Sequence, residues 1–195
     1  IERIFIPTAS SGGQIITYAN SKSALLFGIE LEVLLPLNNI SAALNNFSWG
    51  FNTSIMKTDV EVDLVKNPLE NGKKRALQGA SDWLINSDLK YDFKFNEDMK
   101  NTISLVYGVS GERIYAVGTA GIDHIYEKPF QKLDFVWSSK FSKNMEVKFA
   151  VDNILNPSFK RELGSESKQT ITETDLTVRE YKRGTGFSLG VNYTF

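Results

Sequence analysis

The residues best suited to acid–base chemistry in this chain are Asp123 and His124, the latter being the only histidine. An imidazole next to a carboxylate can act as a general base if a second acidic pair or a nucleophile completes the site. The sequence shows neither the second acidic pair that a protease would need nor a Gly-x-Ser-x-Gly motif. We therefore interpret His124 as a loop residue, predict no catalytic residue and expect no enzymatic activity.

Motifs and composition together exclude several other kinds of site. Gly184-Thr185-Gly186 matches part of a nucleotide-binding loop, but it precedes a strand pattern, whereas such a loop must open a helix. The absence of cysteine excludes a disulfide scaffold and a thiolate zinc site, and no metal site or cofactor is predicted. A net charge of −1 argues against nucleic acid as a partner. No apolar run approaches the roughly 18 to 20 residues of a membrane-spanning helix.

The elements that must position any functional residue are strands, and the last nine residues show this most clearly. Apolar side chains occupy every second position, with small or polar ones between them: Phe187, Leu189, Val191, Tyr193 and Phe195. Successive side chains of a strand point to opposite faces, so this segment has one apolar and one polar face.

The same alternation recurs along the chain. It predicts about eight strands and no helix, centred on residues 1–6, 25–35, 47–55, 83–95, 102–109, 133–141, 145–151 and 187–195. Beyond Lys57 the phase changes, because Val60, Val62 and Leu64 become the apolar positions. Such a change indicates either a β-bulge or the point where the strand leaves its buried belt.

The connections alternate in length. Short turns are expected near residues 37–44, 96–100 and 142–144, and longer connections near 7–19, 66–76, 111–127 and 163–178. This alternation is typical of outer-membrane β-barrels, with tight periplasmic turns and long extracellular loops. At the turn 142–144, Lys140 should lie opposite Glu146. The expected fold is an all-β, antiparallel up-and-down transmembrane β-barrel with a periplasmic C-terminus.

Aromatic residues favour the membrane over a soluble barrel, which also alternates but with its apolar face inward. They lie near the expected periplasmic ends of strands, where an interfacial aromatic girdle belongs: Tyr91, Phe93, Phe95, Phe141, Tyr193 and Phe195. A soluble ligand-binding barrel of lipocalin type is the alternative.

Several stretches besides the closing strand carry a family resemblance: Asn20-Ser21-Lys22-Ser23-Ala24 with Gly28-Ile29-Glu30-Leu31-Glu32, Leu77-Gln78-Gly79-Ala80-Ser81-Asp82-Trp83, Gly111-Glu112-Arg113-Ile114, Tyr126-Glu127-Lys128-Pro129 with Leu133-Asp134, and Asp152-Asn153-Ile154-Leu155-Asn156-Pro157. They resemble the barrel strands of TonB-dependent outer-membrane receptors of the Bacteroidetes type. They cover nearly the whole chain, in the order of the C-terminal barrel region.

The resemblance implies that residues 1–195 are the C-terminal portion of a barrel of about 22 strands, whose plug and TonB box are not in this chain. It implies uptake of a nutrient such as an iron chelate, cobalamin, a glycan or a peptide, energised by TonB through the missing plug. The implied partners are outer-membrane lipid, the remaining barrel and plug segments, and the barrel-assembly machinery. The signal read by that machinery would be Phe187, Leu189, Val191, Tyr193 and Phe195. No ligand-binding residue is carried over.

The chain opens on Ile1, without an initiator methionine or a signal peptide, which predicts a fragment or a processed product. Eight strands cut from a larger barrel would leave two edges that other segments must pair. The alternative from another class is a small, self-contained outer-membrane barrel that acts as an adhesin or structural protein.

Overall fold

The computed structural model describes residues 2–7, 14–96, 99–164 and 176–195, which form three antiparallel sheets of two, four and eight strands. The helices among these residues are two short 3-10 helices, η1 (Leu37–Asn39) and η2 (Ala42–Leu44). The all-β prediction is therefore confirmed for the described residues.

The eight-stranded main sheet contains seven of the eight expected strands. In spatial order they are β14 (Gly186–Tyr193), β11 (Met145–Asp152), β10 (Phe130–Lys140), β7 (Lys100–Ser110), β6 (Trp83–Lys94), β4 (Phe47–Glu61) and β3 (Ser23–Pro36). The two-residue strand β5 (Lys74–Arg75) pairs with β4. The eighth expected strand, β1 (Glu2–Pro7), pairs instead with β2 (Gln14–Ala19), a segment that we had expected to belong to a connection.

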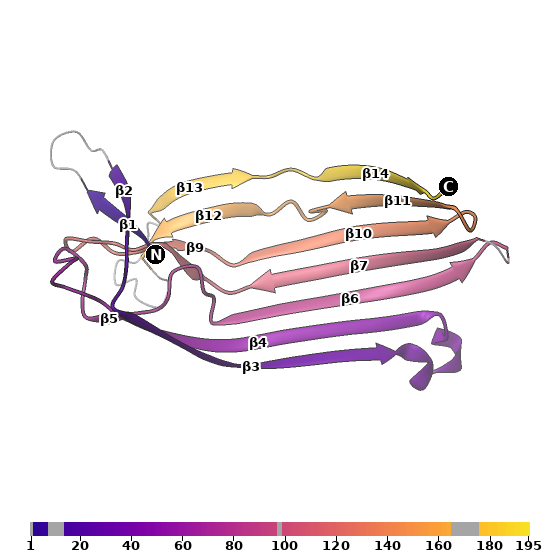
Figure 1. Ribbon diagram of the computed structural model, residues 1–195, viewed down its shortest axis with the longest axis horizontal. Helices are drawn as coiled ribbons and strands as arrows, with labels where there is room; N and C mark the ends of the chain where they lie inside the picture. Colours follow the sequence, from indigo (N-terminus) through magenta and orange to yellow (C-terminus); the bar gives the residue numbers. More distant parts are fainter. Residues whose placement is uncertain (1, 8–13, 97–98, 165–175) are drawn as a thin grey trace.

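The connections are sorted by length between the two ends of the main sheet (Figure 1). Those joining β3 to β4, β6 to β7 and β10 to β11 lie at one end, together with the C-terminus; we call this the turn end. The longer connections lie at the opposite end, the loop end, where the N-terminus is also found. The predicted alternation is confirmed, although residues 8–13, 97–98 and 165–175 of the expected connections lie outside the described residues.

The prediction of about eight strands is too low, because further short strands form at the loop end, within and beside the expected connections. β8 (Arg113–Ala116), β9 (Ile125–Glu127), β12 (Ser158–Leu163) and β13 (Thr177–Lys182) form the four-stranded sheet, in the order β13-β12-β9-β8. This order repeats β14-β11-β10-β7, so each short strand continues one main-sheet strand across a break.

The breaks between the two sheets have local causes. Pro129 has no N–H to donate to a ladder. Asn153, Asn156 and Gly184 have positive φ angles of 58°, 41° and 85°, which no regular strand adopts. The ladder is therefore interrupted at the same level in neighbouring strands.

The main sheet divides its side chains cleanly between two faces. Directly paired residues share a face, and across all seven long strands every such pair joins odd to odd or even to even residue numbers. Lys140 lies opposite Glu146, which confirms the predicted register. β3 and β4 keep one register from Ser23 opposite Glu61 to Pro36 opposite Ser48. The change of phase beyond Lys57 is therefore not a bulge.

The main sheet is open, and the expected closure into a barrel is not found in the described residues. β3 and β14 stand at its two ends, each with a single main-sheet neighbour. The two edges expected of a barrel segment are thus present. Closing the barrel would require a strand or strands that pair with both β3 and β14.

The apolar cores lie at the loop end rather than in the main sheet. One is built from Ile4, Ile114 and Val117, and the other from Ala116 and Ile125. A parallel bridge between Ile4 and Val117 brings β1 to its core. The main sheet itself is a single layer (Figure 1).

Candidate functional site

One face of the main sheet is apolar from edge to edge. A row of directly paired residues crosses all seven long strands and contains only apolar side chains: Leu35, Trp49, Leu89, Leu105, Phe135, Val151 and Phe187. The neighbouring row on the opposite face includes Leu34, Gly50, Asp88, Val106 and Asp134. We call the odd-numbered side the apolar face and the even-numbered side the polar face.

No part of the described chain buries an apolar side chain of the apolar face. The buried apolar residues of the described chain are Ile4, Val60, Val62, Ile114, Ala116, Val117, Ile125, Ala150 and Phe159, and none is an odd-numbered residue of the main sheet. Ile29 is 79% exposed and Leu189 is 70% exposed. An apolar area of this extent marks a surface that meets a membrane or another chain.

Aromatic side chains gather at the turn end of the apolar face. The ring centroids of Phe47 and Tyr91 lie 4.5 Å apart, and those of Tyr91 and Phe93 lie 5.4 Å apart. Phe93 and Phe95 make an edge contact at 5.1 Å. The expected cluster is present at this end, and Phe47 extends it.

The five closing-strand residues singled out from the sequence all have odd numbers. Phe187, Leu189, Val191 and Tyr193 lie in β14 on the apolar face, each more than half exposed, and Phe195 follows the strand, fully exposed. β14 pairs with β11 on one side only, so these residues line an open edge of the sheet.

Toward the loop end, the apolar face stops at a charged boundary. In β4, Ile55 is followed on the same face by Lys57, Asp59 and Glu61. The Nζ atoms of Lys74 and Lys22 lie 2.6 Å from Asp59 and 2.5 Å from Glu61, and both pairs are exposed. The change of phase in the sequence is therefore the end of the apolar belt, the second of the two expected possibilities.

At the same level of β4, the polar face carries buried side chains. Val60, an even-numbered residue, is fully buried. Thr58 is also buried, and its Oγ1 accepts a hydrogen bond of 2.9 Å from the N–H of Leu77. Segments of the loop end therefore pack on the continuation of the polar face and not on that of the apolar face.

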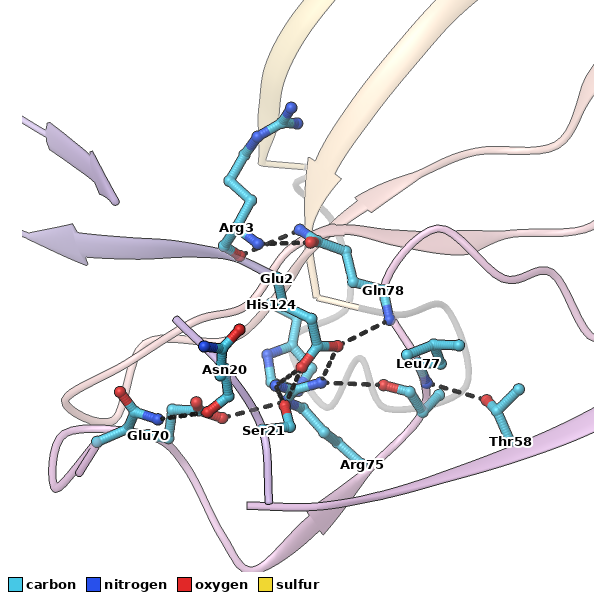
Figure 2. Close-up of polar contacts among 12 residues, drawn as sticks. Glu2, Arg3, Asn20, Ser21, Thr58, Glu70, Arg75, Leu77, Gln78 and His124 are labelled. Carbon is cyan, nitrogen blue, oxygen red and sulfur yellow. Dashed lines mark hydrogen bonds and ion pairs between the residues drawn. The ribbon is translucent and has the colours of Figure 1, made fainter. Parts of the chain in front are cut away.

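At the loop end, Arg75 lies between two carboxylates from distant segments (Figure 2). Its Nη1 and Nη2 donate to the two carboxylate oxygens of Glu2 at 2.6 Å, and its Nε donates to Glu70 at 3.1 Å. All three side chains are at most 8% exposed. Burial raises the pKa of the Glu2 carboxyl, but hydrogen bonds from Arg75, Ser21 and the Gln78 N–H outweigh it and hold this pKa below 4.5.

A second buried ion cluster joins β9, β12 and the segment before β8. Lys128 Nζ lies 2.9 Å from Glu162 and 3.0 Å from Glu112. Burial lowers the pKa of Lys128, and the two carboxylates reverse this effect and raise it above its usual value. Nearby, the Nε of Arg113 donates to Glu127 at 2.9 Å. These ion pairs fix the short strands of the loop end to one another.

A cavity of about 700 Å³ opens beside the Arg75 cluster, lined in part by Trp83, Arg113, His124 and Tyr126. Burial, together with the charges of Glu112 and Asp123, raises the pKa of Tyr126 to about 12, so its hydroxyl stays protonated at neutral pH. The cavity thus combines aromatic rings with charged groups and hydrogen-bond donors.

His124 lies in the connection between β8 and β9, as expected of a loop residue, but it is buried rather than exposed. Its Nδ1 accepts a hydrogen bond of 2.9 Å from the N–H of Gly118. This hydrogen bond holds the connection between β8 and β9 in place, so the burial of His124 has a structural explanation.

Metal-binding clusters and membrane-spanning helices are both absent from the described ranges. No group of three or more His, Asp and Glu side chains there is arranged to hold a metal ion. No helix there is both long and apolar enough to cross a membrane.

Sequence reasoning missed the ion clusters and the cavity. Glu2 is far from Glu70 and Arg75 in the sequence, and charged residues are usually exposed, so nothing in their spacing predicts that the three meet in a buried cluster. The available signal was the stretch from Leu77 to Trp83, which carried part of the family resemblance and borders this region.

Comparison of the chain with protein-family models, with curated proteins and with solved structures gives no match. A functional assignment therefore has to come from the two faces of the main sheet and from the loop end.

Proposed function

We propose that this chain forms part of the wall of an outer-membrane β-barrel, with its apolar face toward lipid. The barrel is a TonB-dependent receptor that imports a nutrient such as an iron chelate, cobalamin, a glycan or a peptide. Further strands complete the barrel by pairing with β3 and β14, since a sheet edge cannot stay unpaired in lipid. The receptor assignment rests on the sequence resemblance, and the wall assignment on the geometry.

The single observation that supports the wall is the apolar row from Leu35 to Phe187, which no part of the described chain covers. A soluble sheet with this composition would need a second layer against it. In an outer-membrane barrel, lipid takes the place of that layer, while the polar face lines the interior.

The dimensions of the belt agree with this proposal. In β3, the apolar face runs from Leu25 to Leu35, and eleven residues at about 3.3 Å each extend roughly 36 Å. The tilt of barrel strands reduces this length toward the roughly 25 Å apolar band of outer-membrane barrels. Charged pairs border the belt at the loop end, and aromatic rings border it at the turn end.

The proposal gives each end of the molecule a location. The turn end and the C-terminus face the periplasm, and the loop end, with its cavity and ion clusters, faces the cell exterior. Ligand arrives at the loop end and passes through the interior bounded by the polar face. TonB acts through a plug that lies outside these residues, and the barrel-assembly machinery binds the closing strand ending at Phe195.

Two other kinds of β-barrel are the alternatives to a receptor. A small, self-contained barrel would use the same wall without a plug. A lipocalin-type barrel would turn the apolar face inward, but the loop end packs on the continuation of the polar face, through Thr58 and Val60, which favours the polar side as the interior.

The three tryptophans of the chain offer a direct test, because Trp49, Trp83 and Trp137 all have odd numbers and lie on the apolar face. In vesicles of brominated lipid, the polypeptide that carries this chain should lose most of its tryptophan fluorescence from these positions, measured in variants that retain one tryptophan each. A lipid-facing wall is refuted if none of the three is quenched.

A second measurement separates the receptor from the small barrel. The denatured polypeptide that carries this C-terminus in its native membrane should have several times the 21.9 kDa mass of these residues. A mass near 21.9 kDa would favour the self-contained barrel and exclude a plug in the same polypeptide.

A further inference from the structure

Three lysines form a row on the polar face at the turn end. Lys100 in β7 lies directly opposite Lys94 in β6 on one side and Lys140 in β10 on the other. All three are exposed. None of them forms an ion pair with a carboxylate in the described part of the chain.

Two carboxylates beside the row on this face accept hydrogen bonds from hydroxyl groups instead. Asp92 accepts a hydrogen bond of 2.6 Å from Thr102 Oγ1. Glu146, opposite Lys140, accepts one of 2.8 Å from Ser138 Oγ. Like charges placed directly opposite in a sheet repel each other, so the lysine row by itself destabilises the sheet.

The lysine row borders a cavity of about 510 Å³ on the polar face. We propose that this row docks an acidic polypeptide segment held inside the barrel. This inference rests on the proposed function, in which the polar face encloses the rest of the receptor. Asp and Glu side chains of that segment neutralise the repulsion among the three lysines.

A polypeptide segment fits the row better than a small anion does. The row covers two strand spacings, about 10 Å, and its three lysines are exposed on one face of the sheet, so they do not enclose a small anion. In an extended segment, side chains two residues apart are about 7 Å from each other on one face, so successive carboxylates can reach all three lysines.

The rest of the polar face favours this position for the acidic segment. Nearer the loop end it carries Glu30 and Glu32, while Asp88 and Asp134 there lie 3.2 Å from Lys90 Nζ and 2.6 Å from Lys132 Nζ. Glu30 and Glu32 repel an acidic segment and the lysine row attracts it, so the charge distribution favours the turn end.

The substitution Lys100→Gln tests the proposal by the sign of its effect. If nothing docks, removal of the central charge relieves repulsion, and the protein becomes more stable. If an acidic segment docks, removal of the charge weakens its contact, and the native protein in its membrane should lose its compact, SDS-resistant form at a temperature a few degrees lower. The control is Lys148→Gln, because Lys148 is exposed on the same face but lies opposite Ser138 and Gly190. An unchanged or raised temperature for Lys100→Gln would overturn the proposal.

Carbodiimide cross-linking of the native protein in its membrane gives a second test, since it joins an amine to a carboxylate in contact. Cross-links from the lysine row should lead to Asp or Glu residues outside residues 1–195. The exposed pairs Lys22–Glu61 and Lys74–Asp59 must cross-link in the same sample and show that the chemistry worked. Docking would be contradicted if the lysine row formed no cross-links, or formed cross-links only to residues within 1–195. Tryptophan quenching by brominated lipid tests the barrel wall separately. Failure of the docking proposal is therefore distinguishable from failure of the proposed function.

Discussion

The loop end and the main sheet expose and bury opposite kinds of side chain. At the loop end, Glu2, Glu70 and Arg75 are buried beside small apolar cores. In the main sheet, Ile29 and Leu189 are largely exposed. A protein in water normally buries its apolar side chains and exposes its charges. The loop end closes its charges into pairs within a packed interior, whereas the main sheet presents an apolar face that is stable only against an apolar surrounding.

The contrast is visible even between neighbouring residues. Lys74 and Arg75 are adjacent in β5, and each pairs with an acidic residue. The pair of Lys74 with Asp59 is exposed on the charged boundary, and the pair of Arg75 with Glu2 is buried. The same kind of contact therefore has a different energetic weight on the two sides of β5, because desolvation decides the cost of breaking it.

The largest effect is expected from Arg75→Met. Removal of the guanidinium leaves Glu2 and Glu70 buried without their partner, which should cost about 3–5 kcal/mol. The loss should appear as faster hydrogen exchange of β1 and of the segment around Gln78. Lys74→Met, the adjacent control, should cost at most about 1 kcal/mol. Equal effects of the two substitutions would show that the loop end is not a packed interior.

Leu105 and Val106 form a matched pair on opposite faces of β7, with exposures of 41% and 39%. Leu105→Arg should weaken membrane insertion by about 2–4 kcal/mol, because the charge would face lipid. Val106→Arg should have little effect, since Val106 lies opposite Asp88 and Asp134. The measurement is the folding equilibrium in vesicles, and similar values for both variants would contradict a lipid-facing apolar face.

Gly118→Ala tests how tightly the connection between β8 and β9 is packed. A Cβ at Gly118 would lie 2.2 Å from the carbonyl oxygens of Ile122 and Asp123. The loop that holds His124 would have to shift, at a cost of about 1–3 kcal/mol. Limited proteolysis of this loop should become faster, while tryptophan quenching of the main sheet stays unchanged. Gly190→Ala is the control, because its Cβ would meet nothing nearer than the carbonyl oxygen of Lys148 at 4.0 Å.

The smallest effect is expected from acid, where the change followed is the protonation of one buried carboxylate, that of Glu2. The folded-state pKa of Glu2 is lower than its usual 4.5, so its stabilising contribution is complete above that value and is lost as the pH falls through the folded-state pKa. β1 should therefore become more susceptible to hydrogen exchange as the pH falls below 4.5, after correction for intrinsic exchange rates. In Glu2→Gln this dependence should disappear. Its persistence in the variant would assign it to another group.

The sequence predicted the main sheet well because its two faces carry different kinds of side chain. Alternating residues such as Leu89, Tyr91 and Phe93 have the period of a strand with one apolar face, and this period located seven strands and their short turns. Register followed from the turn between Lys140 and Glu146, where few residues separate the strands.

The loop end could not be predicted in the same way. β9, with Ile125 and Glu127 both buried, is too short to show a period. β12 and β13 are rich in charge, so their composition resembles that of a loop. The change of phase beyond Lys57 was visible in the sequence, but only the unbroken pairing of β3 with β4 distinguishes a change of surroundings from a bulge.

The division of the main sheet into odd and even residue numbers limits how this sequence can change in length. Deletion of one residue within β7 would send the following apolar side chains to the opposite face until the next connection. Deletion or insertion of two residues would preserve the faces and change only the length of the strand. Length variation among related genes should therefore come in pairs within the long strands, whereas this parity rule does not apply to the loop-end connections.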